Sequence, residues 1–185
     1  LEQIKQDVWI ELNQGLTALE KVRVINHIIF DVHSYSGNTN NYHAPQNSYF
    51  NNMMESKKGN PLSLSILYCV IAQELNLPIY GVNLPEHFIL AYVDTGEILP
   101  ALSNNIADKV LFYINAFSKG SVFSNKEIDV FIKQLKLEPD SKYYEPCSNL
   151  SMIKRLLNNL IYSYQKLGYP DKMEELQQLQ DCLPK

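Results

Sequence analysis

The stretch from Gly59 to Pro78, GNPLSLSILYCVIAQELNLP, constrains the fold most, because through Leu75 it is apolar on almost every side of a helix. Asn60 has a side chain suited to cap the helix, and Pro61 suits the first helical position. A helix that is apolar all round belongs in the centre of a protein. The sequence therefore predicts a buried central helix from about Pro61 to Leu75.

Apolar runs typical of strands follow this helix. The runs IYGVNL and HFILAYVD flank the pair Pro85-Glu86, and a turn at Thr95-Gly96 ends the second run. A third strand is expected in KVLFYINAF, residues 109–117. The segment between, 95–108, has no clear pattern. The sequence thus predicts a small antiparallel sheet beside the central helix.

Helical patterns precede and follow this core. Capping boxes at Thr17 with Glu20, and at Ser124 with Glu127, mark two helix starts. Residues 34–47 are turn-rich and predict an irregular loop, with a short helix stopped at Gly59 after it. The helices are expected over residues 2–14, 17–33, 48–58, 124–137, 149–169 and 170–183.

The order of these elements predicts an α+β fold, in which a buried helix packs against a small antiparallel sheet. We expect a core with N-terminal helices over residues 1–137. A C-terminal helical pair over residues 138–185 should pack on it as part of one compact unit. The pair is similar to a single tetratricopeptide unit. The chain begins at Leu1 within a helical pattern, so we expect residues upstream of it.

Charge and cysteine content narrow the function classes. The 185 residues carry a net charge of −4, so no nucleic acid or anionic membrane is expected as a partner. No apolar run reaches the roughly 18 residues of a membrane span, and no signal peptide is visible. Three cysteines without CxxC spacing, Cys69, Cys147 and Cys182, argue against a disulfide framework and a zinc site. These features favour a reducing, cytoplasmic location.

A histidine, His87, opens the second predicted strand and raises the question of catalysis. In papain-type and transglutaminase-type sites a cysteine begins the central helix, where the helix dipole and a nearby imidazole favour its thiolate. The histidine comes from a strand that packs across the helix start, and an Asp or Asn on the next strand orients it. The predicted helix and strands have this order.

The motifs identify a family. GNPLSLSILYCVIAQELNLPIYGVNLPEHFIL resembles the transglutaminase-like superfamily, and specifically its bacterial SirB-type branch. YHAPQNSYFNNMMESKKGNPLSLSILY is similar to that branch's Tyr-x-x-Pro-x-Asn-Ser-Tyr-Leu element before Gly-x-Pro-x-Ser-Leu. IKRLLNNLIYSYQKLG is similar to its Arg-x-Leu-x-Asn-Leu tail. The resemblance runs from about Leu16 to Leu183 and implies a transglutaminase- or cysteine-protease-like core.

The resemblance also implies where a catalytic triad would lie. It places Pro61 in the nucleophile position, His87 in the base position and Asn115 in the acid position. Proline carries no nucleophile, so the expected thiol chemistry is absent. The resemblance therefore implies a catalytically inactive domain with a regulatory or protein-binding role, whose partner would be a protein or peptide.

Two alternatives stay open. Ser65 lies one turn above Pro61, about 6 Å along the helix, so a hydrolase or transferase using His87 with Ser65 or an activated water is conceivable. Ser63 points the other way, and both serines are expected to bond backbone carbonyls within the helix. In the second alternative His87 is purely structural and bonds backbone across the helix–strand junction. Cys69 is expected in the core.

A binding cleft is expected around the three triad positions. It would hold a peptide or a small molecule and require no cofactor. His27, His33 and His43 have no helical spacing with carboxylates that would suggest a metal site, so no metal is expected either. The expected cleft residues are Tyr42, His43, Tyr49, Asn60, Glu86 and Tyr113.

Overall fold

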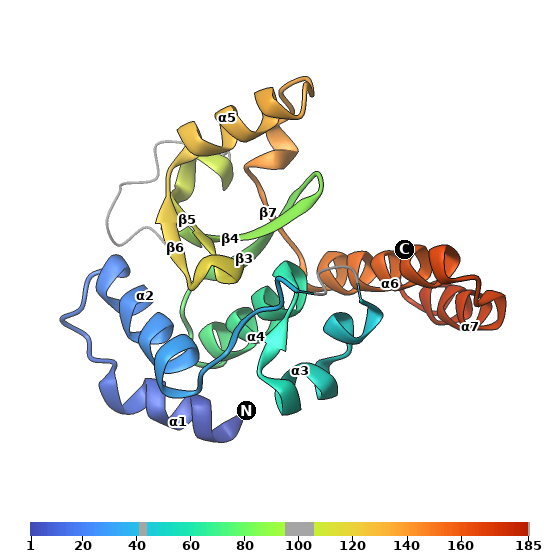
Figure 1. The fold of residues 1–185 in the computed structure, drawn as a ribbon. Helices are drawn as coiled ribbons and strands as arrows, with labels where there is room; N and C mark the ends of the chain where they lie inside the picture. Colours follow the sequence, from blue (N-terminus) through green and yellow to red (C-terminus); the bar gives the residue numbers. More distant parts are fainter. Residues whose placement is uncertain (41–43, 95–105, 185) are drawn as a thin grey trace.

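A five-stranded antiparallel sheet forms the middle of the molecule (Figure 1). The computed structural model describes residues 1–40, 44–94 and 106–184. The strands lie in the order β6-β5-β4-β3-β7, so the hairpin of β3 and β4 is central to the sheet. Their bounds are β3 Ile79–Leu84, β4 His87–Val93, β5 Val110–Asn115, β6 Ser121–Phe123 and β7 Pro146–Cys147.

The predicted central helix is confirmed as α4, Pro61–Glu74, which packs on β3 and β4. Its N-terminus has a full capping box: the Asn60 side chain accepts from the Ser63 backbone N–H at 2.8 Å, and Ser63 Oγ accepts from the Asn60 N–H at 3.0 Å. Leu67 and Tyr68 within it are fully buried. This burial on several sides explains why the helix is apolar all round.

The other face of the sheet is covered by α5, Asn125–Gln134 (Figure 1). Ile128 and Ile132 of α5 pack against side chains from β3, β4 and β5, including Ile89 and Tyr113, in a second, smaller core. The sheet therefore separates two cores, with α4 on one side and α5 on the other. The predicted α+β fold is confirmed.

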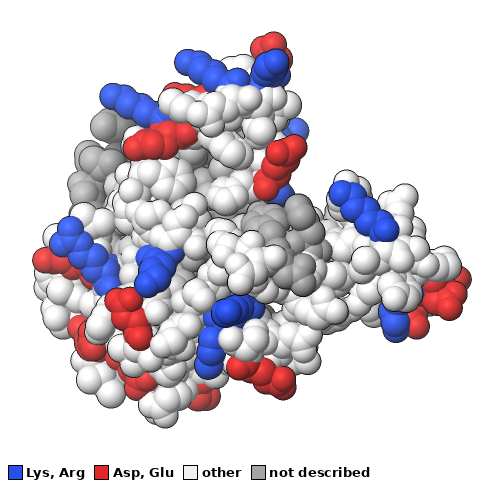
Figure 2. All heavy atoms as spheres, in the orientation of Figure 1, with Lys and Arg blue, Asp and Glu red and all other residues white. Residues whose placement is uncertain are grey.

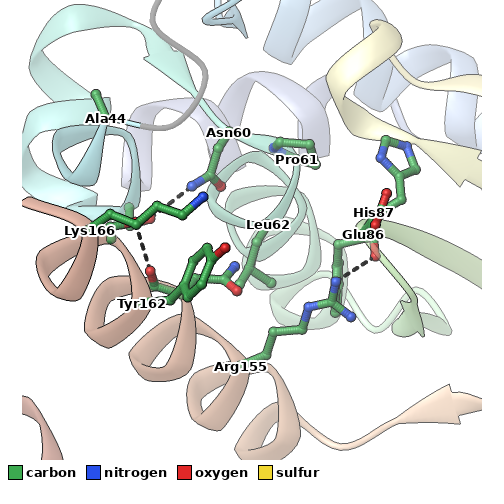
Figure 3. Close-up of a pocket in the computed structure, with 13 residues that line it drawn as sticks. Ala44, Asn60, Pro61, Leu62, Glu86, His87, Arg155, Tyr162 and Lys166 are labelled. Carbon is green, nitrogen blue, oxygen red and sulfur yellow. Dashed lines mark hydrogen bonds between the residues drawn. The ribbon is translucent and has the colours of Figure 1, made fainter.

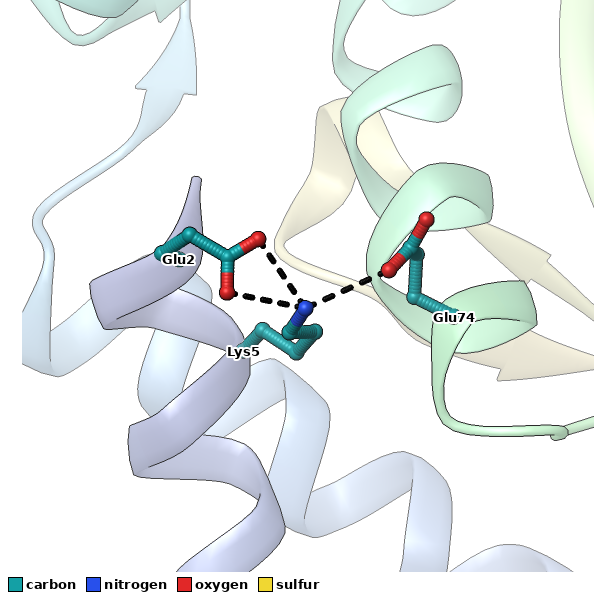
Figure 4. Close-up of polar contacts among 3 residues, drawn as sticks. All are labelled: Glu2, Lys5 and Glu74. Carbon is teal, nitrogen blue, oxygen red and sulfur yellow. Dashed lines mark hydrogen bonds and ion pairs between the residues drawn. The ribbon is translucent and has the colours of Figure 1, made fainter.

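Two N-terminal helices pack around α4: α1, Glu2–Glu11, and α2, Ala18–Asn26. Lys5 of α1 lies 2.8 Å from a carboxylate oxygen of Glu2 and 3.3 Å from one of Glu74, at the last turn of α4 (Figure 4). Such exposed pairs contribute little to stability. The buried side chains Ile4 and Val8 are what hold α1 against the core.

Several boundaries differ from the predictions. The first helix ends at Glu11, and α2 continues as a π-helical segment, His27–Val32, that completes the predicted stretch. The short helix α3, Phe50–Ser56, is stopped by Lys57 at φ 59°, not by Gly59. Gly59 instead lies in the two-residue strand β2, and a Cβ there would meet Ser63 Oγ at 2.6 Å. Glycine is required at this point because the chain passes so close to the start of α4.

Short elements were missed by the sequence patterns. Edge strands β6 and β7 have three and two residues, too few to show a periodicity. β7 falls in a predicted loop and pairs with Gly81 and Val82 of β3. Lys58–Gly59 (β2) pairs in parallel with Ser36–Gly37 (β1). Short 3₁₀ turns lie at η2 Pro45–Ser48, η3 Ile106–Lys109, η4 Ala116–Ser118 and η5 Ser141–Tyr143.

The C-terminal helices α6, Asn149–Leu167, and α7, Pro170–Asp181, form an antiparallel pair that projects from the rest of the molecule (Figure 1). Gly168 at φ 74° ends α6, and Pro170 starts α7. Met152, near the start of α6, is buried in the main core. A division of the chain at residues 137/138 stays a prediction. In the described ranges, no helix is both long and apolar enough to cross a membrane.

Candidate functional site: a cleft at the start of the central helix

A cleft of about 500 Å³ lies between the start of α4, the tip of the β3–β4 hairpin and one side of α6 (Figure 3). Its wall from the core consists of Ala44, Ser48, Asn60, Pro61, Leu62, Glu86, His87 and Phe88. Its wall from α6 consists of Arg155, Asn159, Tyr162, Ser163 and Lys166. The two expected triad positions Pro61 and His87 thus border one cavity.

A tight turn places His87 at the cleft. Leu84 pairs with His87, so only Pro85 and Glu86 connect β3 to β4, and Glu86 takes a left-handed conformation at φ 57°. His87 is therefore the first residue of β4 and lies at the edge of the sheet. Its ring also packs against Phe131 of α5, with 5.9 Å between ring centroids. His87 thus lies between the cleft and α5.

Asn115 lies beside His87, as the resemblance implied, and its amide orientation is determined by its other bonds. Asn115 Oδ1 accepts from the backbone N–H groups of Phe117 at 3.1 Å and Ser118 at 3.3 Å. The remaining amide nitrogen, Nδ2, lies 3.3 Å from His87 Nε2. Because Nδ2 is a donor only, Nε2 must accept, and the neutral ring carries its proton on Nδ1.

The surroundings of His87 keep its ring neutral. Burial lowers the pKa of His87, and the positive charge of Arg155 lowers it further. An imidazole whose pKa lies below its ordinary value is uncharged near pH 7. Nδ1–H has no hydrogen-bond partner in the part of the chain that the structure describes, so the ring keeps one unused donor.

Arg155 of α6 joins the tail to the hairpin that bears His87. Its guanidinium donates to the backbone carbonyls of Leu84 at 2.7 Å and His87 at 3.0 Å, and to Asn83 Oδ1 at 3.3 Å. It also lies 5.7 Å from the centroid of the Phe88 ring. The hairpin tip and α6 are therefore held together, and the cleft between them has two fixed walls.

The serines of α4 differ from the expectation. Ser63 Oγ donates to the carbonyl of Asn60 at 3.3 Å, in line with the prediction. Ser65 is fully buried, and its Oγ has no hydrogen-bond partner within the described residues, so the prediction for Ser65 was wrong. Ser65 is also absent from the lining of the cleft. The structure does not bring Ser65 and His87 together at that surface.

The structure places only some of the expected cleft residues in the lining of the cleft. Asn60 and Glu86 line the cleft. Tyr113 does not, because it is fully buried on the α5 side and donates to the carbonyl of Tyr144 at 2.9 Å. Tyr49 lies outside the lining, and its hydroxyl is 2.8 Å from that of Tyr164 of α6. Tyr42 and His43 lie outside the described residues.

One entire wall was missed from the sequence. The five α6 residues of the lining recur at spacings of three and four, so they form one face of the helix. Lys166 Nζ lies 4.4 Å from the centroid of the Tyr162 ring, which it covers (Figure 3). The same helical spacing of polar and aromatic residues is readable in the sequence, but only the fold shows what that face meets.

No other described group offers thiol or metal chemistry at the cleft. Burial raises the pKa of the Cys69 thiol, and burial likewise raises the pKa of Cys147 to about 11, so both stay protonated. Within residues 1–40, 44–94 and 106–184, no group of three histidine, cysteine, aspartate or glutamate side chains could hold a metal ion.

On the face drawn in Figure 2, basic and acidic side chains are interspersed.

The fold and the cleft agree with the result of family comparison. The model of the transglutaminase-like superfamily matches residues 1–158, so the chain belongs to that superfamily. Among curated proteins, F-box only protein 21 of Mus musculus is 28% identical over 155 residues, covering 84% of this chain and 23% of that protein. A UPF0162 protein of Xylella fastidiosa is 39% identical over 80 residues, covering 43% and 28%.

The chain spans about a quarter of the length of these relatives. A further UPF0162 protein, from Pasteurella multocida, is 27% identical over 88 residues, or 48% of this chain and 33% of that protein. No solved structure matches the chain significantly.

Proposed function

We propose that this chain is a transglutaminase-like domain that has lost catalysis and binds a segment of another protein in the cleft, with a regulatory or accessory role. The observation that carries the proposal is Pro61, which borders the cleft at the first position of α4, where the superfamily resemblance places the nucleophile. A proline side chain supplies no nucleophile. We also propose that the domain belongs to the SirB-type branch, comes from a bacterium and is located in the cytoplasm. Its C-terminal helices would form a tetratricopeptide-like tail.

The contact between Asn115 and His87 supports the loss of catalysis. In a nucleophile–histidine–acid site, the third group accepts a hydrogen bond from the ring and so stabilises the imidazolium that forms. Here Asn115 Nδ2 donates to His87 Nε2, because backbone donors occupy its oxygen. An imidazolium would present a second N–H to that amide N–H. The pair therefore opposes the charged form.

The α6 wall supports binding. Tyrosine and arginine are common among residues that dominate protein interfaces, and Tyr162 exposes 56% of its surface beside the cleft. The relatives carry the matching region as a minor part of longer chains, as expected of a binding module within larger proteins.

The proposal is tested with a variant whose side chain fills the cleft. Asn159→Trp places a large side chain in the lining, whereas Gln165→Trp, on the same helix and outside the lining, is the matched control. Wild type and both variants, each with a photo-crosslinking residue at Ser163, are exposed to lysate of the source organism. We expect crosslinked partners with wild type and Gln165→Trp and their loss with Asn159→Trp. Equal crosslinking by Asn159→Trp would contradict the proposal.

A second candidate is a hydrolase in which His87 activates a water. It is favoured by one observation, the neutral ring of His87 at the cleft, because a general base must be uncharged at the working pH. Assays of hydrolysis with ester and amide substrates distinguish this candidate from the binding proposal. Turnover that disappears in His87→Ala, with the fold retained, would establish this candidate and exclude the binding-only proposal.

A further inference from the structure

The described lining of the cleft has more cationic than anionic side chains. Among the described residues, its lining holds two cationic side chains, Arg155 and Lys166, and one carboxylate, Glu86. The protein as a whole is acidic, with a net charge of −4. A local excess of positive charge in an acidic protein favours an anionic ligand at that place.

Lys166 is the cation that is available for such a ligand. Its ammonium lies over the Tyr162 ring, and in the described ranges it forms no ion pair with a carboxylate. Arg155, by contrast, uses its guanidinium on the hairpin carbonyls. An ammonium group brings three donors and attracts a carboxylate from any direction.

The charged groups lie at two ends of the cleft. Lys166 and Tyr162 lie at one end, and Glu86 and His87 lie at the other, with Pro61 and Leu62 between them (Figure 3). A carboxylate is attracted at the Lys166 end and repelled at the Glu86 end. At that second end, His87 Nδ1–H is a neutral donor, suited to a backbone carbonyl.

The mixed lining of the cleft suits an extended chain better than a free anion. The lining combines the apolar side chains of Pro61, Leu62 and Phe88 with amide and hydroxyl groups such as Asn159 and Ser163. Peptide groups that leave water require such partners. Clefts of roughly 300–1,000 Å³ enclose drug-sized ligands, and this one, at about 500 Å³, has room for a few residues.

We infer that the cleft binds a short extended peptide segment that carries an acidic side chain, with its carboxylate on Lys166 and a backbone carbonyl on His87 Nδ1–H. This inference rests on the proposed binding function and names the class of its ligand. The charge pattern also sets the end of the cleft at which the acidic side chain lies, because a carboxylate is repelled by Glu86.

The test uses two libraries of immobilised heptapeptides with random flanks, one with Glu fixed at the centre and one with Gln. Affinities of the best sequences are then measured in matched Glu and Gln pairs by fluorescence anisotropy. We expect each Glu peptide to bind roughly five- to tenfold tighter than its Gln partner, the range for a hydrogen-bonded charge at a partly exposed site. Lys166→Met should abolish that preference, whereas Lys133→Met, an exposed lysine of α5 outside the cleft, should preserve it.

Each outcome decides the question. Equal binding of Glu and Gln peptides, lost in Asn159→Trp, would overturn the acidic-ligand inference and leave the proposed function intact. A Glu preference that survives Lys166→Met would overturn the assignment of Lys166. Binding of N-acetylglutamate amide as tight as that of the peptides would replace a peptide ligand by a small carboxylate. Absence of binding by every peptide would overturn both the inference and the proposed peptide-binding function.

Discussion

Asn115 donates a hydrogen bond to His87, with 3.3 Å between Nδ2 and Nε2, and the amide is held in that orientation by two backbone N–H groups. The pair keeps the geometry of a catalytic histidine and its orienting residue but reverses the direction of the hydrogen bond. The reversed bond disfavours a charged ring, so it supports the proposed loss of catalysis independently of Pro61.

Restoring the thiol alone should therefore not restore its activation. We expect the thiol introduced by Pro61→Cys to keep a pKa at least about 1 unit above that of the same thiol in Pro61→Cys/Asn115→Asp. In the double variant the added carboxylate oxygen accepts from Nε2–H and stabilises an imidazolium. Alkylation of residue 61 across a pH series, followed by peptide mass spectrometry, gives both values. Indistinguishable pKa values would refute the proposed role of the amide.

The lowered pKa of His87 makes folding dependent on pH in a definite direction. The unfolded chain, with a histidine pKa near 6.5, binds more protons than the folded chain from that pH down to the folded pKa. Stability should therefore fall on acidification through this window, by at most about 1.4 kcal/mol per pH unit from this group. His87→Gln removes the effect, so urea unfolding at pH 7, 6 and 5 should show a smaller loss for the variant. Equal losses of stability on acidification in wild type and His87→Gln would contradict the assignment of this pH dependence to His87.

Arg155 should be a major stabiliser of the hairpin. Arg155→Met removes the donor to the carbonyls of Leu84 and His87, and we expect a loss of about 2–3 kcal/mol in the free energy of unfolding. The neighbouring Lys154→Met, which has none of these contacts, should change it by less than about 0.5 kcal/mol. Chemical denaturation measures both variants, and equal values would show that the contacts carry no net energy.

Ser65 offers a test that separates structure from catalysis. Ser65→Ala removes a buried hydroxyl that has no partner among the described residues, so we expect stability to be unchanged or raised by up to about 1 kcal/mol. Ser63→Ala removes half of a capping box and should cost about 1 kcal/mol. Thermal unfolding of both variants checks the contrast. Any hydrolysis abolished by Ser65→Ala alone would instead make Ser65 a nucleophile.

The sequence by itself determined the elements whose signals lie within a few residues. Asn60 and Pro61 mark the start of α4, Pro85-Glu86 marks the hairpin, and Gly168 followed by Pro170 separates α6 from α7. The α+β class also came from the sequence, and the assignment of Pro61, His87 and Asn115 to triad positions, which the resemblance implied, stays a prediction. Capping bonds, turns and helical periodicity involve near neighbours, so they are readable along the chain.

Only the tertiary structure decided what these elements enclose. Arg155 reaches the carbonyl of Leu84 across 71 positions, and nothing in the local pattern of α6 indicates that contact. The burial of Tyr113 on the α5 side depends likewise on a helix that comes later in the chain. The direction of the Asn115–His87 bond follows from backbone donors in the turn after β5. Such features depend on packing between distant segments, because a cleft exists only where two surfaces meet.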